Sequence, residues 1–325
     1  MILVVAVVLS FGLSFWLISD NSPLKILDSP NERSLHESPT PRTGGVAILM
    51  SLMVAWLWLA MNSLCPVEIF WIAGAAILVA CVSFLDDLRE VSPLLRIVVH
   101  GLAATLLIVG GGLTLDGLSG VVITWLAIIW MLNLYNFMDG IDGFAGGMAV
   151  CGFAFLGLAG WLQGNEVYAY YAWVISAASF GFLLLNFPPA RIFMGDLGSA
   201  TLGLLVASFS LWGIGNELFP IWFPVLVFSP FVIDATVTLI RRAMLGEKVW
   251  LAHKGHYYQR LVQAGWSHRK TVLGEYVLMI LAGCSALLAQ QVAIPVVTIA
   301  TLVGWGVLYL MITILIQLHK SGGVE

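Results

Sequence analysis

Long apolar stretches recur from one end of the chain to the other, and they constrain the fold more than any other feature. A helix needs about 20 apolar residues to cross the roughly 30 Å hydrocarbon core of a bilayer. Hydrophobic residues make up 60 % of the chain and charged residues 10 %, whereas about a quarter of residues are charged in soluble domains. The stretches lie at 1–18, 44–61, 68–85, 94–112, 120–138, 143–163, 167–187, 197–214, 221–243, 271–290 and 294–318. The sequence therefore predicts an all-α, polytopic membrane bundle of about 10–11 transmembrane helices.

The basic residues predict how this bundle is oriented. If successive helices alternate in direction, all 14 Lys and Arg residues fall in or beside the connections on one side. The connections on the other side contain neither residue type: 62–67, 113–119, 164–166, 215–220 and 291–293. Basic residues accumulate in short cytoplasmic loops. We therefore expect the N-terminus outside and the C-terminus inside the cell.

Charge and cysteine content exclude several classes of protein. The net charge is −4 and no basic block occurs, so nucleic acid is not an expected partner. Cys65, Cys81, Cys151 and Cys284 are widely separated and show no metal-binding or redox spacing. We found no repeat or linker, so residues 1–325 are interpreted as a single integral membrane domain.

Two of the inward connections carry charged residues at helix ends. Arg42 follows a proline-rich segment at the entry to the second apolar stretch, where it is either a topological anchor or a ligand for substrate. Asp86 and Asp87 are adjacent at the end of the third stretch. Neighbouring carboxylates repel unless a cation or proton is near. The pair is therefore either a solvated helix end or part of a site.

The connection after the fifth stretch carries polar residues at helical spacing. Asn133, Asn136 and Asp139 recur every three residues, which predicts one polar stripe on a helix. Amides and a carboxylate are costly in hydrocarbon, so the stripe must face a protein or water-filled cavity. A functional interpretation is favoured over helix–helix hydrogen bonding. Further along, Asp196 precedes an apolar stretch, where a carboxylate can hold a hard cation while helix N–H groups meet anionic oxygens.

The longest inward connection contains two histidines among basic residues. His253 and His256 lie near Lys254 and Arg260. This patch suits a diphosphate or the charge that develops as one leaves. An interfacial loop touching anionic lipid is the alternative. Asp234, inside the ninth stretch, either shapes the site or pairs with a polar neighbour within the bundle.

Taken in order, these segments resemble the polyprenyl-phosphate N-acetylhexosamine-1-phosphate transferase family. The resemblance spans most of the chain and implies a helical fold with a cytoplasmic active-site cleft in the bacterial inner (plasma) membrane. It rests on five motifs: Pro39-Thr-Pro-Arg-Thr-Gly-Gly, Asp86-Asp87, Asn133-x-x-Asn-x-x-Asp-Gly-x-Asp-Gly, Phe193-Met-Gly-Asp-x-Gly-Ser and His253-x-x-His.

The same resemblance implies roles for particular residues. Asp86, Asp87 and Asp139 match the catalytic acids of the family, while Asp196 and Asn136 match its ligands for Mg²⁺, with Mn²⁺ as a substitute ion. Which of Asp86 and Asp87 acts as a base is left open. The residues predicted to bind substrate are Arg42, Asn133, Asp142, Arg191, His253, His256 and Arg260.

The implied reaction transfers a sugar-1-phosphate from a UDP-activated N-acetylated amino sugar to undecaprenyl phosphate and releases UMP. His253-Lys-Gly-His and Glu90 replace the three-histidine run and the lysine of the muramoyl-pentapeptide branch. A branch that starts O-antigen or related lipopolysaccharide glycans is therefore favoured over the peptidoglycan step. The rivals are a transporter and a polyprenyl-diphosphate phosphatase. A transporter would carry ionisable groups near the bilayer midplane, whereas nearly all acids here lie at helix ends. Homodimer formation is left open.

Overall fold

The computed structural model describes residues 1–28, 39–62, 65–89, 91–248 and 254–321, and these are almost entirely helical. Strands β1 (Leu27–Asp28) and β2 (Thr40–Pro41) form one short antiparallel pair. The helices in the described ranges are α1 (Ile2–Ile18), α2 (Gly44–Asn62), α3 (Val67–Leu88), α4 (Pro93–Val109), α5 (Gly117–Phe137), α6 (Phe144–Leu162), α7 (Glu166–Asn186), α8 (Gly195–Gly215), α9 (Trp222–Val227), α10 (Ser229–Met244), α11 (Tyr257–Gln263), α12 (His268–Val292) and α13 (Pro295–Ser321). The predicted all-α, polytopic class is confirmed.

The lengths of these helices fit a membrane protein. Within the described residues, eight helices are long and apolar enough to cross a bilayer, and α1 and α4 are shorter apolar helices of 17 residues each. Together they match ten of the eleven predicted stretches to within about three residues at each end.

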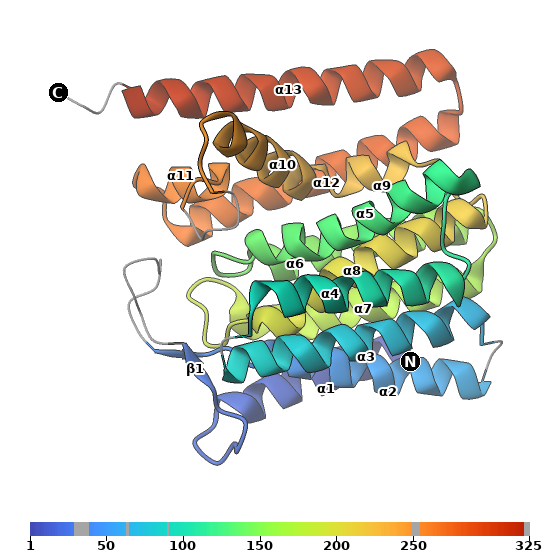
Figure 1. Cartoon of the computed structure of the whole chain (residues 1–325), viewed down its shortest axis with the longest axis vertical. Helices are drawn as coiled ribbons and strands as arrows, with labels where there is room; N and C mark the ends of the chain where they lie inside the picture. Colours follow the sequence, from blue (N-terminus) through green and yellow to red (C-terminus); the bar gives the residue numbers. More distant parts are fainter. Residues whose placement is uncertain (29–38, 63–64, 90, 249–253, 322–325) are drawn as a thin grey trace.

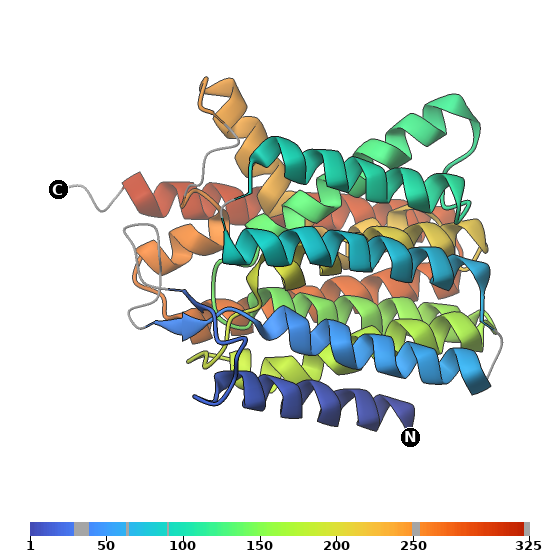
Figure 2. The same cartoon turned by 60° about the horizontal axis from the view of Figure 1, so that its bottom comes forward.

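The ninth stretch, expected as one span, differs. It is divided into α9 and α10, which meet at Phe228. Pro230 lies in the first turn of α10, where its missing N–H costs nothing. The same residue cannot continue a helix that enters from α9, because proline has no N–H to donate to the preceding turn. Figure 2 shows α10 leaning away from the other helices at the top of the view.

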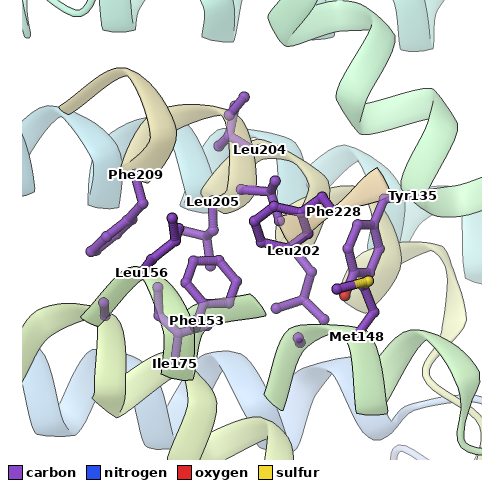
Figure 3. Packing of buried hydrophobic residues seen from close by; sticks show 14 of the residues in the cluster. Tyr135, Met148, Phe153, Leu156, Ile175, Leu202, Leu204, Leu205, Phe209 and Phe228 are labelled. Atoms are coloured by element: carbon purple, nitrogen blue, oxygen red, sulfur yellow. The ribbon is translucent and has the colours of Figure 1, made fainter. Parts of the chain in front are cut away.

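The bundle is built around α8. In the 18-residue apolar part of α8, 83 % of the residues are buried. Helix α8 packs against α3 and α5. Helices α6 and α7 pack on each other, and α7 also packs on α1. Figure 3 shows aromatic side chains from several elements meeting here. The ring of Phe153 on α6 lies 5.7 Å from that of Phe209 on α8 and 6.2 Å from that of Phe228, both edge to face. The core thus ties α6, α8 and the α9–α10 break together.

The connections that carry the polar motifs lie at one end of the bundle. In Figure 1, β1, α11 and the connections α5–α6 and α7–α8 gather at the left, where α13 also ends. Helix α1 begins at the opposite end, as Figure 2 shows. Segments from the first, middle and last thirds of the chain are therefore close enough to form one site.

Candidate active site

The first part of the site is a junction between the segment before α2 and the segment before α8. The N–H of Phe193 donates to the carbonyl of Pro41 (2.7 Å), and the N–H groups of Gly44 and Gly45 donate to the carbonyls of Phe193 (2.9 Å) and Met194 (2.8 Å). A Cβ atom on Gly45 would collide with the backbone of α8. The first and fourth motifs are therefore joined backbone to backbone, which only a glycine-rich segment allows.

The aspartate pair at the end of α3 lies against this junction. The carboxylate of Asp86 accepts a hydrogen bond from Nη1 of Arg96 (2.8 Å) and another from the N–H of Val91 (2.7 Å). Nη1 of Arg96 also lies 3.7 Å from Oδ2 of Asp196. Arg96 therefore bridges two carboxylates that are 110 residues apart in the sequence. The sequence prediction missed this role of Arg96, because its position on α4 gave no sign of these partners.

The carboxylate of Asp87 is buried and meets the start of α8 directly. It accepts hydrogen bonds from the N–H groups of Asp196 (3.2 Å) and Leu197 (3.1 Å), and Arg42 donates through Nη2 to the carbonyl of Asp87 (2.5 Å). The sequence predicted that the N–H groups of this helix end meet anionic oxygens. In the structure two of these N–H groups donate to the carboxylate oxygens of Asp87.

The connection between α5 and α6 brings Asp139 to the same place. Helix α5 ends at Phe137, so Asp139 lies just beyond the helix and the expected three-residue stripe is only partly helical. Burial, and then the negative charges of Asp196, Asp87 and Asp142, raise the pKa of Asp139 to about 7. In the part of the chain that the structure describes, the Asp139 carboxylate has no hydrogen-bond or ion-pair partner. Carboxylates from three separate stretches thus lie within mutual electrostatic reach.

The two predicted asparagines are held by side chains that the sequence did not suggest. The amide oxygen of Asn136 accepts a hydrogen bond from the hydroxyl of Ser199 on α8 (2.6 Å). The amide nitrogen of Asn133 donates to the carbonyl of Ile129 (2.7 Å) and lies 3.4 Å from Nδ1 of His100. Asn136 therefore joins α5 to α8 beside Asp196, whereas Asn133 faces α4.

Asp142 and Asn186 fix the α5–α6 connection against the segment before α8. Asp142 accepts a hydrogen bond from the N–H of Ala190 (3.0 Å) and lies 3.5 Å from Nδ1 of His268. Asn186 accepts from the N–H of Gly143 (2.9 Å) and donates to the carbonyl of Ile192 (2.8 Å). Arg191, on the same segment, is exposed and makes no ion pair with any described residue. Its guanidinium is therefore available to a ligand.

The last motif lies partly outside the described residues, which include His256 but not His253. His256 is buried, and its ring stacks near those of Phe137 (6.4 Å) and Tyr258 (5.8 Å). Its Nδ1 lies 3.2 Å from Oδ1 of Asp234, which also accepts from the N–H of Tyr257 (2.9 Å). Asp234 thus caps α11 and pairs with polar neighbours inside the bundle. The sequence had left open whether Asp234 pairs in this way or shapes the site.

Helix α11 connects this motif to the rest of the site. The hydroxyl of Tyr258 donates to the carbonyl of Phe137 (3.1 Å), next to the connection that carries Asp139. Nε of Arg260 donates to the carbonyl of Gly255 (2.8 Å), and its guanidinium lies 5.2 Å from the ring centre of Tyr257. Burial and the charge of Arg241 lower the pKa of Arg260.

A pocket of about 850 Å³ lies beside α11, between α12 and α13. Its walls are mostly apolar side chains such as Leu261, Leu278 and Ile312. Arg260 and Glu275 are its charged residues. The pocket therefore combines an apolar interior with a cation from the α11 motif.

The acidic part of the site has the chemistry that Mg²⁺ prefers. Mg²⁺ binds through one or two carboxylates and keeps water and phosphate oxygens as its other ligands. Asp196 is 38 % exposed at its side chain, and the unpartnered Asp139 lies within reach of its charge. Among the described residues no group of three or more His, Cys, Asp and Glu side chains is arranged to hold a metal.

Comparisons with known proteins show which family the chain belongs to. The sequence model of glycosyl transferase family 4 matches residues 69–214. A probable undecaprenyl-phosphate N-acetylglucosaminyl 1-phosphate transferase of Bacillus subtilis (strain 168) is 30 % identical over 283 residues, covering 82 % of this chain and 78 % of that protein. A decaprenyl-phosphate N-acetylglucosaminephosphotransferase of Mycobacterium tuberculosis (strain CDC 1551 / Oshkosh) is 31 % identical over 75 % of this chain and 70 % of its own length.

A third relative extends the comparison to Escherichia coli (strain K12). Its undecaprenyl-phosphate alpha-N-acetylglucosaminyl 1-phosphate transferase is 26 % identical, covering 82 % of this chain and 75 % of its own. The fold, the site and these relatives define a polytopic membrane enzyme that transfers a sugar phosphate. The chain belongs to the polyprenyl-phosphate N-acetylhexosamine-1-phosphate transferases of glycosyl transferase family 4.

Proposed function

We propose that the chain transfers an N-acetylated amino-sugar-1-phosphate from a UDP-sugar to undecaprenyl phosphate and releases UMP. The observation that carries this proposal is the convergence of Asp86, Asp87, Asp139 and Asp196 with Arg42 and Arg96 at one end of the bundle. Such a mixture of carboxylates and guanidinium groups suits a diphosphate held with a divalent cation. The names of the relatives support a polyprenyl phosphate as the acceptor and an N-acetylated amino-sugar phosphate as the group transferred.

The chemistry asks the protein mainly for positioning and charge neutralisation. A phosphate monoester has a second pKa of about 6, so the acceptor phosphate is largely dianionic at neutral pH and needs no strong base. Its terminal oxygen attacks the sugar-linked phosphorus, and the bond to the UMP oxygen breaks. The exposed Arg191 and the basic residues near α11 would stabilise the charge on the departing UMP.

Asp196 would hold Mg²⁺, with Asn136 and Asp139 as neighbouring oxygen donors, and the bound ion would supply electrostatic stabilisation of the diphosphate. The observation in favour is that the pKa of Asp139 is raised by burial and then by the negative charges of Asp196, Asp87 and Asp142, because a cation between these groups would relieve the repulsion. Asp86 and Asp196 are held near each other because both contact the guanidinium of Arg96.

We propose that the pocket between α11, α12 and α13 takes the apolar chain of the acceptor. Its Leu and Ile walls suit an isoprenoid, and Arg260 offers a cation to the phosphate. Ile312→Trp would fill the pocket and should raise the undecaprenyl phosphate concentration for half-maximal rate several-fold, leaving the value for UDP-sugar unchanged. Val303→Trp is the matched control, because Val303 is 60 % exposed on the same helix and does not line the pocket. Equal effects of the two changes would contradict this location.

The orientation and the pathway belong to the same proposal. All 14 basic residues lie on one side of an alternating topology. The protein would therefore lie in the bacterial inner membrane with its site on the cytoplasmic face. The departures at the histidine motif and at position 90 favour a step that starts a surface glycan such as O-antigen over the peptidoglycan step.

The test is a product assay with purified protein, undecaprenyl phosphate, Mg²⁺ and a panel of labelled UDP-sugars. The panel contains UDP-GlcNAc, UDP-FucNAc, UDP-QuiNAc and UDP-MurNAc-pentapeptide. Release of UMP with a labelled lipid diphosphate is the expected result. In a parallel reaction with undecaprenyl diphosphate as the lipid, release of inorganic phosphate would instead indicate a phosphatase. Turnover of the pentapeptide donor alone would move the chain to the peptidoglycan step.

A further inference from the structure

The two members of the aspartate pair have different surroundings. The side chain of Asp87 is 3 % exposed, that of Asp86 9 %, and that of Asp196 38 %. Asp86 contacts Arg96 and the N–H of Val91, both close to it in the sequence. Asp87 instead binds two N–H groups of α8 that are more than 100 residues away.

Helix α8 depends on this distant carboxylate for its cap. Met194 occupies its N-cap position, and no side-chain cap comes from that residue. The first N–H groups of a helix have no partner within the helix and favour an anion. Oδ1 of Asp87 accepts from Asp196 and Oδ2 accepts from Leu197. Asp87 therefore holds the backbone N–H of Asp196, the residue whose own carboxylate is exposed at the site.

The surroundings of Asp87 are closed on the other sides. Arg42 binds its carbonyl through Nη2, and Nε of Arg42 lies 3.7 Å from its Oδ1. Gly195 has a φ of +75°, and a Cβ there would collide with the carbonyl of Arg42 and lie 3.0 Å from Oδ2 of Asp87. Among the described residues these contacts leave only 3 % of the Asp87 side chain exposed, so a substrate oxygen that reached this carboxylate would have to displace the junction.

We infer that Asp87 is a positioning residue, which fixes the first turn of α8 and thereby aims Asp196, and that it is not the base of the reaction. Arg42 holds Asp87 in place and acts through it. This inference rests on the proposed function only where turnover is concerned. The claim about α8 stands on the structure alone.

The test begins with Asp87→Asn. An asparagine keeps one acceptor oxygen and points an NH2 group at the other N–H, so one of the two caps is lost. Hydrogen–deuterium exchange of the α8 amides at Asp196 and Leu197 should become at least about tenfold faster. Asp86→Asn is the matched control and should leave exchange in this turn unchanged. Unchanged exchange in Asp87→Asn would overturn the inference.

Metal affinity and pH dependence separate positioning from chemistry. Binding of Mn²⁺ alone, followed by electron paramagnetic resonance, should weaken about tenfold in Asp87→Asn. At saturating Mg²⁺ the variant should recover much of its turnover and keep the wild-type pH profile. Loss of turnover at every Mg²⁺ concentration, with exchange or Mn²⁺ affinity as in wild type, would identify Asp87 as a chemical participant and overturn the inference.

Arg42→Gln provides an independent route if Asp87→Asn fails to fold. It should speed exchange of the same two amides. Where both single variants fold, the double variant should be no worse than the more affected single variant, because the two residues act through one contact. Additive effects would count against a shared role. If wild-type protein releases no UMP from any donor, the proposed function fails, yet the exchange measurements still decide the role of Asp87.

Discussion

Helices α8 and α13 both qualify as membrane spans, yet they differ in almost every other respect. The apolar window of α13 has a mean hydropathy of 2.3 and is 0 % buried, whereas that of α8 has a mean hydropathy of 1.6 and is 83 % buried. In a bilayer lipid tails are as apolar as leucine, so helices pack through small residues that allow close approach. Gly, Ala, Ser and Thr are frequent along α8. The less apolar helix is therefore the structural centre.

The two helices belong to different regions of the chain. The family match covers residues 69–214, which run from α3 to α8 and contain the aspartate pair, Asp139 and Asp196. The region from α9 onward contains the broken span, the histidine motif and the pocket. We propose that the first region supplies the acidic residues for the metal, and that the second supplies the basic residues of the α11 motif and the surface that faces the lipid.

The largest expected effect is on UMP release, and it tests whether the contribution of an acid to activity depends on the region in which it lies. Asp196→Asn in α8 should lower UMP release by about a thousandfold or more, because the metal and its electrostatic stabilisation are lost. Glu217→Gln removes an exposed acid in the connection between α8 and α9, outside the matched region, and should stay within about threefold of wild type. Initial rates at saturating substrates measure both. Comparable losses would erase the distinction between the regions.

Much of the fold was predictable because hydropathy and length decide which segments cross a membrane. The second stretch was expected at 44–61 and is Gly44–Asn62, and the eighth was expected at 197–214 and is Gly195–Gly215. The ninth was not, because Pro224 and Pro230 lie in a continuous apolar stretch that hides the break between α9 and α10. Hydropathy also could not rank α8 above α13 as the core, since burial against protein and burial in lipid demand the same apolar side chains.

The candidate site was predictable in its acids and less so in their partners. Clustering of Asp86, Asp139 and Asp196 at one end is found in the structure. The contacts of Arg96 were missed, and Ser199 was part of the fourth motif without an assigned role, because both contacts join residues on different helices. His256 was expected to face substrate, but it is buried against Asp234. The catalytic, metal-binding and substrate-binding roles stay predictions.

A second pair of changes tests the packing side of the comparison. A Cβ on Gly203 of α8 would lie 2.6 Å from the carbonyl oxygen of Met131 and 2.8 Å from Cα of Leu132, whereas nothing lies within 4 Å of one on Gly304 of α13. Gly203→Ala should destabilise the protein by about 1–3 kcal/mol, because α5 must move. Gly304→Ala should cause no loss. Apparent melting temperatures in one detergent provide the measurement, and equal shifts would show that α8 is no more tightly packed than α13.

The smallest expected effect concerns Asp139, which lies where the two regions meet, beside the Tyr258 contact to Phe137. Its pKa is raised from 3.8 to about 7. Between these values the folded protein keeps a proton that the unfolded chain releases, so stability of the metal-free protein falls as pH rises from about 4 to 7. Added Mg²⁺ should offset that loss above pH 7.

The same titration predicts a shift in metal requirement. Below pH 7 a proton competes with the cation, so the Mg²⁺ concentration for half-maximal UMP release should rise by up to about tenfold per pH unit. Asp139→Asn should flatten this dependence, whereas Asp116→Asn, in the α4–α5 connection at the other end of the bundle, should preserve it. A dependence that survives in Asp139→Asn would assign the titration to another group. Asp139, where the two regions meet, would then make no contribution to the affinity for the metal.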